Sequence, residues 1–376
     1  MLLSEDHLAV QDAVRAYAQD CIAPHAARWD KAHHFPAAEL KGLAALGCYG
    51  VAVPTEYDGA GLDYLALAVI IEEIAAADGA TSTVVSVNNC PVCSILMAWA
   101  NEAQKQQWLR PLARGDMLGA FCLTEPHVGS QADGLKTTAV KDGNSYVLNG
   151  VKQFITSGKN GNVAVVMAVT DKAAGKKGIS AFIVPTNTPG YNVARIEDKM
   201  GQHASDTAQI VFENCRIPAT NLLGEEGQGL KIALSGLEGG RIGIAAQSVG
   251  MARAAFEAAL RYSKDRVTFG KPIFEHQALQ FRLADMATRI EAARQLTHHA
   301  ASLKDAGRPC LKEAAMAKVF ASEMAESVCS AALQVHGGYG YLSDFPVERI
   351  YRDVHACQIY EGTSDVQRIL IGRALA

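Results

Sequence analysis

The sequence predicts an α+β protein of three domains, with helices at both ends of the chain and a β-domain in the middle. Apolar residues at helical spacing fill the first and last parts, while short apolar and β-branched runs separated by turn dipeptides fill the centre. At 376 residues the chain can hold several packed domains. The predicted domains are an N-terminal helical domain (1–117), a β-domain (118–226) and a C-terminal helical bundle (227–376).

The N-terminal domain is predicted from apolar residues that recur every three to four positions, as at Val10, Val14 and Tyr17. Residues 65–77 are apolar on nearly every side and predict a helix buried all round. Glycines in 57–61 indicate a loop between these helices.

The β-domain is predicted from runs of apolar and β-branched residues at 118–123, 137–140, 145–148, 153–156, 163–169, 179–184 and 209–212. Turn dipeptides lie between or beside these runs. Asn149-Gly150 is one of them, and Asn-Gly between apolar runs is a strong hairpin signal. The pattern predicts a β-sandwich or barrel.

The C-terminal domain is predicted from long helical segments at 232–262, 279–303, 311–335 and 366–375. The first three have lengths suited to antiparallel packing, so a four-helix bundle is expected.

Composition narrows the class of protein. Hydrophobic residues make up 49% and charged residues 20%, which is typical of a soluble globular protein. The net charge of -4 and the absence of clustered basic residues argue against nucleic-acid binding. No apolar run reaches membrane-spanning length, and the N-terminus has no signal-peptide pattern. We expect a cytoplasmic bacterial protein, or one of the mitochondrial matrix if an import segment has been removed.

The nine cysteines do not indicate a metal or redox site. Cys90 and Cys93 form the one C-x-x-C pair, and no second pair follows at zinc-ligand spacing. Two buried thiols in a helical region are the expected outcome.

One carboxylate near the C-terminus has the setting of a general base. Glu361 stands beside Tyr360 and Gly362, and Thr363 or Ser364 is expected to cap a helix that follows at once. The helix N-terminus favours the carboxylate, whereas an apolar pocket favours the neutral acid, so the pKa can be brought towards working pH. The alternative is an ordinary solvated charge in the first turn.

Other segments carry glycines and polar residues suited to cofactor binding, although no G-x-G-x-x-G fingerprint follows a strand. Gly239 and Gly240 lie inside a helical pattern at a cost of about 1 kcal/mol each, which predicts close approach of another group. A kink or a tight helix crossing is the rival interpretation.

Seven segments together resemble the acyl-CoA dehydrogenase family, in the family's order. They are Leu123–Ala132, Asn149–Ser157, Lys199–Thr207, Leu237–Ile242, Arg266–Ile273, Gln334–Tyr341 and Gln358–Asp365, the last containing the Y-E-G-T-S motif. The chain departs from the family pattern at His127 for Gly, Gln131 for Asp and His203 for Arg. Taken singly, most of these segments could equally be ordinary loops or helix caps.

The resemblance implies FAD as cofactor and a set of site residues. Contacts to FAD are expected from Leu123, Thr124, Gly129, Ser130, Phe154, Thr156, Arg266, Phe269, Gln277, Gln334, Gly337, Gly338, Thr363, Ser364 and Asp365. Contacts to acyl-CoA are expected from Ser130, Glu238, Gly239, Gly240, Arg241 and Gly362. In the family, Arg266, Phe269, Gln277 and the segment 334–341 would reach the FAD of a neighbouring subunit.

The function implied is oxidation of a short-chain or short branched-chain acyl-CoA to the trans-2-enoyl-CoA. Glu361 would take the α-proton, flavin N5 the hydride, and an electron-transferring flavoprotein the electrons. The family resemblance also implies a homotetramer, a dimer of dimers. Alternatives within the family are an acyl-CoA oxidase and a desulfinase-like elimination enzyme. A non-catalytic, DNA-associated flavoprotein is a further alternative, disfavoured by the acidic balance.

Overall fold

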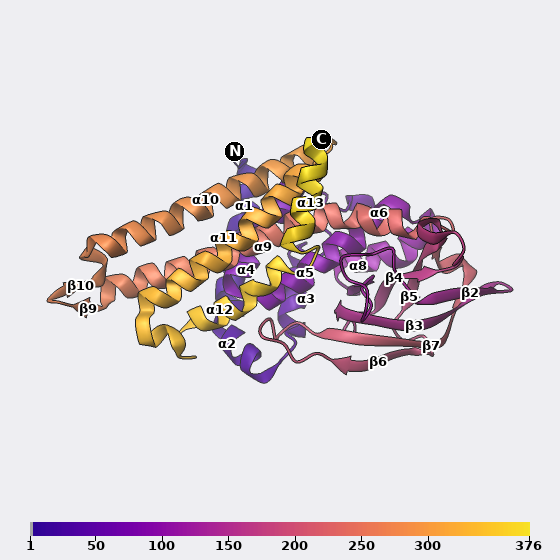
Figure 1. Ribbon diagram of the computed structural model, residues 1–376, viewed down its shortest axis with the longest axis horizontal. Coiled ribbons are helices and arrows are strands. Elements are labelled where there is room, and N and C mark those ends of the chain that lie inside the picture. Colours follow the sequence, from indigo (N-terminus) through magenta and orange to yellow (C-terminus); the bar gives the residue numbers. More distant parts are fainter. Residues whose placement is uncertain (1–2) are drawn as a thin grey trace.

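The structure is a computed structural model that describes residues 3–376, and it has the predicted α+β class. Figure 1 shows the long C-terminal helices at one end of an elongated molecule and the β-sheet at the other. The first helices of the chain lie between these two parts.

The N-terminal part is helical, as predicted. Its helices are α1 (Glu5–Tyr17), α2 (Ala23–Ala32), α3 (Ala37–Ala45), α4 (Tyr64–Ala77), α5 (Gly79–Val87), α6 (Ser94–Trp99), α7 (Glu102–Gln104) and α8 (Arg110–Arg114). Helix α4 is buried on almost every side. Asp63 caps it by accepting a hydrogen bond from the Ala66 N–H at 2.7 Å. Cys90 and Cys93 lie in η3 (Asn88–Cys93) as free, buried thiols, as predicted.

The middle of the chain forms one sheet. Its strands are β1 (Gly119–Cys122), β2 (Thr138–Asp142), β3 (Ser145–Thr156), β4 (Val163–Val169), β5 (Ile179–Pro185), β6 (Tyr191–Ile196), β7 (Thr207–Pro218) and β8 (Leu222–Leu223). The order is β6-β7-β3-β2-β4-β5-β8, with β1 paired to β4. Strands β6 and β8 were not among the predicted runs.

The predicted turn at Asn149-Gly150 is wrong, because β3 runs through it without interruption. The register with β7 shifts between Leu148 and Gly150, which makes the dipeptide a β-bulge. Gly150 has φ +148, and a Cβ there would lie 2.5 Å from Thr137 Oγ1. The glycine therefore serves a close backbone approach inside the sheet rather than a hairpin.

The C-terminal part is the predicted bundle. Its helices are α9 (Gly229–Asp265), α10 (Gln277–Asp305), α11 (Leu311–His336), α12 (Pro346–Val354) and α13 (Ser364–Leu375). Helix α12 was not predicted. A two-stranded antiparallel sheet joins α9 to α10. Its strands are β9 (Val267–Thr268) and β10 (Lys271–Pro272). Helix α9 packs against both α11 and α4, so it joins the bundle to the N-terminal helices.

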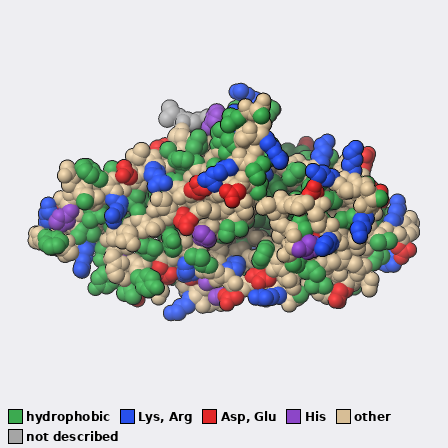
Figure 2. Space-filling model, viewed as in Figure 1, with side chains coloured by type: hydrophobic (Ala, Val, Ile, Leu, Met, Phe, Trp, Pro, Cys, Tyr) green, Lys and Arg blue, Asp and Glu red, His purple; other side chains and the backbone are tan. Residues whose placement is uncertain are grey.

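Within residues 3–376, no helix combines the length and the apolar character needed to cross a bilayer. Figure 2 shows Lys and Arg interspersed with Asp and Glu over the face it presents.

Candidate active site

Glu361 lies on a sharp turn between η9 (His355–Gln358) and α13. Its backbone has φ 56, a left-handed conformation that is uncommon for a residue with a side chain, and Gly362 follows with φ 92. Thr363 is the N-cap of α13, and its Oγ1 accepts a hydrogen bond from the Val366 N–H at 3.3 Å. The side chain carried on this strained turn is that of Glu361, and it reaches helix α9.

The Glu361 carboxylate points at helix α9. A Cβ added to Gly240 would lie 2.5 Å from Glu361 Oε2, so only glycine leaves room for the carboxylate. Oε2 is buried and makes no hydrogen bond among the described residues. Burial raises the pKa of Glu361 to about 7, although the charges of Arg241 and Lys318 act to lower it. Desolvation therefore outweighs the neighbouring cations, and the group is poised to exchange a proton near neutral pH.

The glycine pair in α9 satisfies both interpretations of its sequence. Gly240 admits Glu361, whereas a Cβ at Gly239 would lie 2.9 Å from Cys90 Sγ of the neighbouring η3. The first is a close approach of a functional group and the second a tight helix crossing. Helix α9 runs on through both residues.

The backbone that carries Glu361 is held from two helices. Lys318 on α11 donates from Nζ to the Gly362 carbonyl at 2.8 Å. Gln367 on α13 donates from Nε2 to the carbonyls of Gly362 at 2.8 Å and Glu361 at 3.2 Å. Both side chains are fully buried.

Tyr360 is anchored where the three parts of the chain meet. Its hydroxyl donates to Gln247 Oε1 on α9 and accepts from Gln202 Nε2 at 3.3 Å, on the loop before β7. Thr83 on α5 bonds to both glutamines, donating to Gln202 Oε1 at 2.7 Å and accepting from Gln247 Nε2 at 2.6 Å. The residue before the carboxylate is thus fixed by all three parts.

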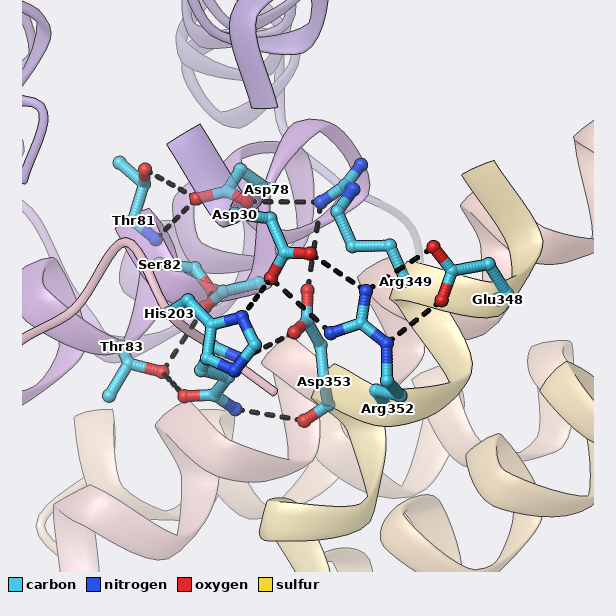
Figure 3. A network of polar contacts seen from close by, with 12 residues as sticks. Asp30, Asp78, Thr81, Ser82, Thr83, His203, Glu348, Arg349, Arg352 and Asp353 are labelled. Carbon is cyan, nitrogen blue, oxygen red and sulfur yellow. Dashed lines mark hydrogen bonds and ion pairs between the residues drawn. The ribbon is translucent and has the colours of Figure 1, made fainter. Parts of the chain in front are cut away.

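A buried charge network continues from this junction (Figure 3). Arg349 on α12 lies 3.0 Å from Asp78 and 3.6 Å from Asp353. Asp353 accepts a hydrogen bond from the Gln202 N–H. Burial, with the charges of Asp78 and Asp30 adding to it, raises the pKa of Asp353 to about 7 despite Arg349. Arg352 pairs with Asp30 at 2.7 Å and so joins α12 to α2.

His203, which departs from the family pattern, belongs to this network. Its Nδ1 lies 2.8 Å from Asp30 Oδ1, and its Nε2 lies 2.6 Å from the Lys199 carbonyl. His33, Asp198 and His203 could offer ligand atoms within 4.8 Å of one another. Because both His203 nitrogens already face oxygen acceptors and its ring stacks on that of His33 at 4.2 Å, the cluster is better explained as structural than as a metal centre.

A cavity of about 210 Å³ opens beside Tyr360, and it contains two of the residues expected at the flavin. Phe154 and Thr156, at the end of β3, line it together with Met200 and Ile359. Phe154 is 62% exposed, Met200 55% and Ile359 57%, so three large apolar side chains are left uncovered around one cavity.

Leu123 and Thr124 lie just outside this cavity, next to β3. The Gln153 N–H donates to the Thr124 carbonyl at 2.9 Å. A buried ion pair supports the segment, with Lys152 Nζ 2.8 Å from Glu125 Oε1 and 3.1 Å from the Leu123 carbonyl. Gly129 and Ser130 follow on an exposed loop.

A second cavity, of about 480 Å³, borders Gly239 of the glycine pair. Glu238 and Gly239 line it from α9, and Tyr64 and Cys90 line it from α4 and η3. Gly239, which borders this cavity, is next to Gly240, which touches the Glu361 carboxylate, and Tyr360, which precedes Glu361, lines the cavity beside β3. Arg241 is 4% exposed, with its Nε unpaired.

Six of the remaining expected FAD residues gather at the far end of the bundle, whereas Thr363, Ser364 and Asp365 begin α13 next to Glu361. Arg266, Gln334, Gly337 and Gly338 line one cavity of about 400 Å³. Phe269 is 95% exposed nearby, and Gln277 is exposed at the start of α10. Figure 1 shows β9 and β10 at the opposite end of the molecule from β3, so the structure divides the predicted FAD residues between two places.

Several residues that hold the site were missed in the sequence. Lys318, Gln367, Gln247 and Gln202 were given no role, although one signal was available. Lys318 is in helical register with Ala314 and Ala321, both buried, so the pattern places a lysine on the apolar face of α11.

The chain matches known proteins over its whole length. The N-terminal domain of acyl-CoA dehydrogenase matches residues 4–116, the middle domain 120–215 and the C-terminal domain 227–376. The chain is 46% identical to the mitochondrial short-chain specific acyl-CoA dehydrogenase of Mus musculus, over 98% of this chain and 90% of that protein.

Solved structures agree with these matches. Butyryl-CoA dehydrogenase of Megasphaera elsdenii is 41% identical with a TM-score of 0.97, covering 100% of this chain and 99% of that chain. A chain in the structure of the electron transferring flavoprotein of Acidaminococcus fermentans is 47% identical with a TM-score of 0.98, again over 100% and 99%.

Proposed function

Because the chain belongs to the FAD-dependent acyl-CoA dehydrogenase family, we propose that it oxidises a short-chain acyl-CoA to the trans-2-enoyl-CoA, with Glu361 as the catalytic base. The observation that carries the proposal is the buried carboxylate oxygen of Glu361 that makes no hydrogen bond, set against Gly240 and next to Tyr360, which lines the cavity proposed for the flavin. A short branched acyl chain belongs to the same proposal.

The residues present fit a flavin. The cavity beside Tyr360 leaves Phe154, Met200 and Ile359 uncovered, which suits a flat aromatic ring, and it offers the Thr156 hydroxyl as a hydrogen-bond donor. At the end of the bundle, Arg266 and the glycines 337 and 338 offer a guanidinium and open backbone to phosphate groups. When bound, FAD supplies the acceptor for the hydride that leaves the β-carbon.

Glu361 performs the proton transfer in this proposal. The substrate's thioester would lie between the Glu361 carboxylate and the cavity proposed for the flavin, with its α-carbon before the carboxylate and its β-carbon towards the flavin. Its acyl chain would extend towards the cavity lined by Cys90 and Gly239. A pKa of about 7 keeps a large share of Glu361 ionised at neutral pH while leaving it basic enough to accept the proton. Burial of Oε2 excludes water from the same atom, which strengthens every electrostatic interaction around it.

The divided FAD residues imply an oligomer. One chain presents ring-binding residues near β3 and phosphate-binding residues near β9, at opposite ends of the molecule in Figure 1. A complete site then needs a second subunit, and we propose a homotetramer, a dimer of dimers. Figure 2 shows hydrophobic side chains on the end of the molecule where Figure 1 has β9 and β10, and Phe269 and Tyr341 are 95% and 91% exposed there.

The electron acceptor is proposed to be an electron-transferring flavoprotein, supported by the likeness to the Acidaminococcus fermentans chain. We place the protein in the cytoplasm, with the mitochondrial matrix as the alternative that the mouse relative's name raises.

A panel of acyl-CoA esters of graded length and branching, mixed without oxygen with the FAD-loaded protein, tests the proposal. We expect butyryl-CoA or isobutyryl-CoA to bleach the flavin fastest. A preference for long chains would reject the substrate class, and no bleaching by any ester would reject the dehydrogenase activity. Oxygen uptake without an added carrier would indicate an oxidase instead.

A further inference from the structure

Lys318 is a buried lysine that makes no ion pair among the described residues. Its side chain is fully buried in α11, and its one hydrogen bond goes to the Gly362 carbonyl at 2.8 Å. Taking an ammonium group out of water is costly unless a carboxylate compensates it. Burial lowers the pKa of Lys318 to about 8, so the group is still mostly charged at pH 7. A neutral donor could serve the carbonyl, so this charge calls for a further explanation.

Arg241 has the same property on the facing helix α9. It is 4% exposed, makes no ion pair among the described residues, and its Nε is unpaired. Of the carboxylates, Glu361 has the largest electrostatic effect on each of the two cations. Its Oε2 also makes no hydrogen bond. Glu238 also acts on Arg241, but it is paired with Lys304 at 3.0 Å. Glu361 is then the one carboxylate without an ion pair that acts on both buried cations.

The charged and titratable groups that act on Lys318 come from three neighbouring segments and from α11 itself. Arg241 faces it from α9, Cys357 from η9 and Glu361 from the turn before α13, while Glu323 lies on α11 itself. Glu323 already pairs with Arg368 at 2.7 Å on the surface. With the Cys357 thiol neutral, because burial raises its pKa, the buried set is left with a surplus positive charge.

We propose that Lys318 is a positioning residue for the base, which fixes the Gly362 carbonyl and, with Arg241, gives the closed site a positive charge that favours an anionic ligand. The inference rests on the proposed function and deepens it. Loss of the α-proton leaves negative charge on the thioester oxygen, as an enolate. A site with surplus positive charge stabilises that anion more than it stabilises the neutral thioester, which is the condition for catalysis.

The same geometry predicts an effect on Glu361 before substrate binds. The Lys318 charge acts to lower the pKa of Glu361 and so opposes the effect of burial. Replacing Lys318 by an uncharged residue should raise that pKa further, and the base should then become active only at higher pH. A lysine with a purely structural role would leave the pH profile where it is.

The first experiment compares Lys318→Met and Lys318→Gln with the wild-type enzyme. The glutamine variant keeps a donor for the Gly362 carbonyl, and both variants remove the charge. The rate of flavin bleaching by butyryl-CoA is measured from pH 5.5 to 9. Read below pH 8, where Lys318 is mostly charged, the acid limb is expected to move up by as much as about one pH unit in both variants, because a nearby positive charge that lowers the pKa of Glu361 is lost. Lys312→Met, at a half-buried lysine on the same helix that is paired with Glu313, is the control and should not move it.

The second experiment measures anion preference by equilibrium binding and needs no turnover. Acetoacetyl-CoA has an acidic α-proton and can bind as its enolate, whereas crotonyl-CoA cannot. We expect Lys318→Met to weaken acetoacetyl-CoA binding about tenfold, the equivalent of one pKa unit, and to leave crotonyl-CoA binding nearly unchanged. Equal weakening of both ligands, or of neither, would overturn the inference.

The outcomes separate this inference from the function beneath it. A wild-type enzyme that no acyl-CoA reduces would refute the proposed function, and the ratio of the two binding constants would still decide on Lys318. An active wild type with an unmoved acid limb in both variants would refute only the role of Lys318. If Lys318→Met does not fold, Lys318→Gln carries both measurements.

Discussion

Two lysines are fully buried within residues 3–376, and they are buried in different ways. Lys152, in the sheet, lies 2.8 Å from Glu125 and 3.1 Å from the Leu123 carbonyl, so its charge is compensated by contact. Lys318, in the bundle, contacts one carbonyl and no carboxylate. We infer that a paired buried charge stabilises the fold, whereas an unpaired buried charge beside the base is available to a ligand.

The substitution expected to change activity most is the one that removes the Glu361 carboxylate, near the unpaired Lys318. Glu361→Gln keeps the shape but cannot accept the α-proton, so turnover should fall by about 10³-fold or more, within the range for a lost general base. FAD retention and thermal unfolding should be unchanged, because the carboxylate makes no hydrogen bond that holds the fold. Flavin content and turnover with butyryl-CoA provide the measurement.

The two lysines should respond in opposite ways to the same substitution. Lys152→Met leaves Glu125 buried without its partner and should lower the free energy of unfolding by about 3–5 kcal/mol. Lys318→Met strands no contacting carboxylate, so stability should stay within about 1 kcal/mol or rise. Urea unfolding of both variants measures this. Equal losses of stability would mean that the two burials do not differ as argued.

Gly240 tests the site where helix α9 contacts the Glu361 carboxylate. Gly240→Ala would place a Cβ 2.5 Å from Glu361 Oε2 and displace the base, which should lower the rate by about 10²-fold. Alanine favours a helix by about 1 kcal/mol over glycine, so stability should not suffer equally. Gly372→Ala, in a helix with open space around it, is the control and should keep full activity.

The smallest effect concerns Asp353, a carboxyl that the network of Figure 3 holds with a pKa raised from 3.8 to about 7. Between these pH values the folded protein binds a proton that the unfolded chain does not. Stability from this group is therefore fully present below pH 3.8 and is lost as pH rises towards 7.

Asp353→Asn should flatten that dependence by at least about 1 kcal/mol, roughly one pKa unit. Unfolding of both proteins at pH 5 and pH 8 measures the change. A slope that is the same in the variant would show that Asp353 is ionised in the folded protein.

The sequence was informative where one local cause decides the structure. Val163–Val169 is a strand at the predicted residues, because a continuous apolar run suits a strand buried on both faces. Thr363 was one of two predicted caps, and its hydroxyl makes the capping bond. Distant contacts could not be predicted in the same way. Asn149-Gly150 has the letters of a turn, yet approach of Thr137 makes it a bulge.

In the site too, features with a local sequence cause could be predicted, and features that depend on distant contacts could not. Glu361 and Gly240 could be named from motifs, but their contact depends on how α13 meets α9, which no local pattern specifies. Gln247 and Gln202, which anchor Tyr360, come from regions with no shared sequence signal. Assignment of Arg266 and Phe154 to one cofactor stays a prediction, because they lie in separate cavities of one chain.

Glu361, which burial holds near a pKa of 7, is proposed to take the substrate's α-proton. The most direct test is the rate of anaerobic flavin reduction by butyryl-CoA in single-turnover mixing, followed from pH 5.5 to 9. In the wild type, the rate of flavin reduction should increase as the pH is raised past about 7. In Glu361→Gln, the rate should be nearly lost at every pH. Undiminished reduction in that variant, or a wild-type rate that does not change across this range, would contradict it.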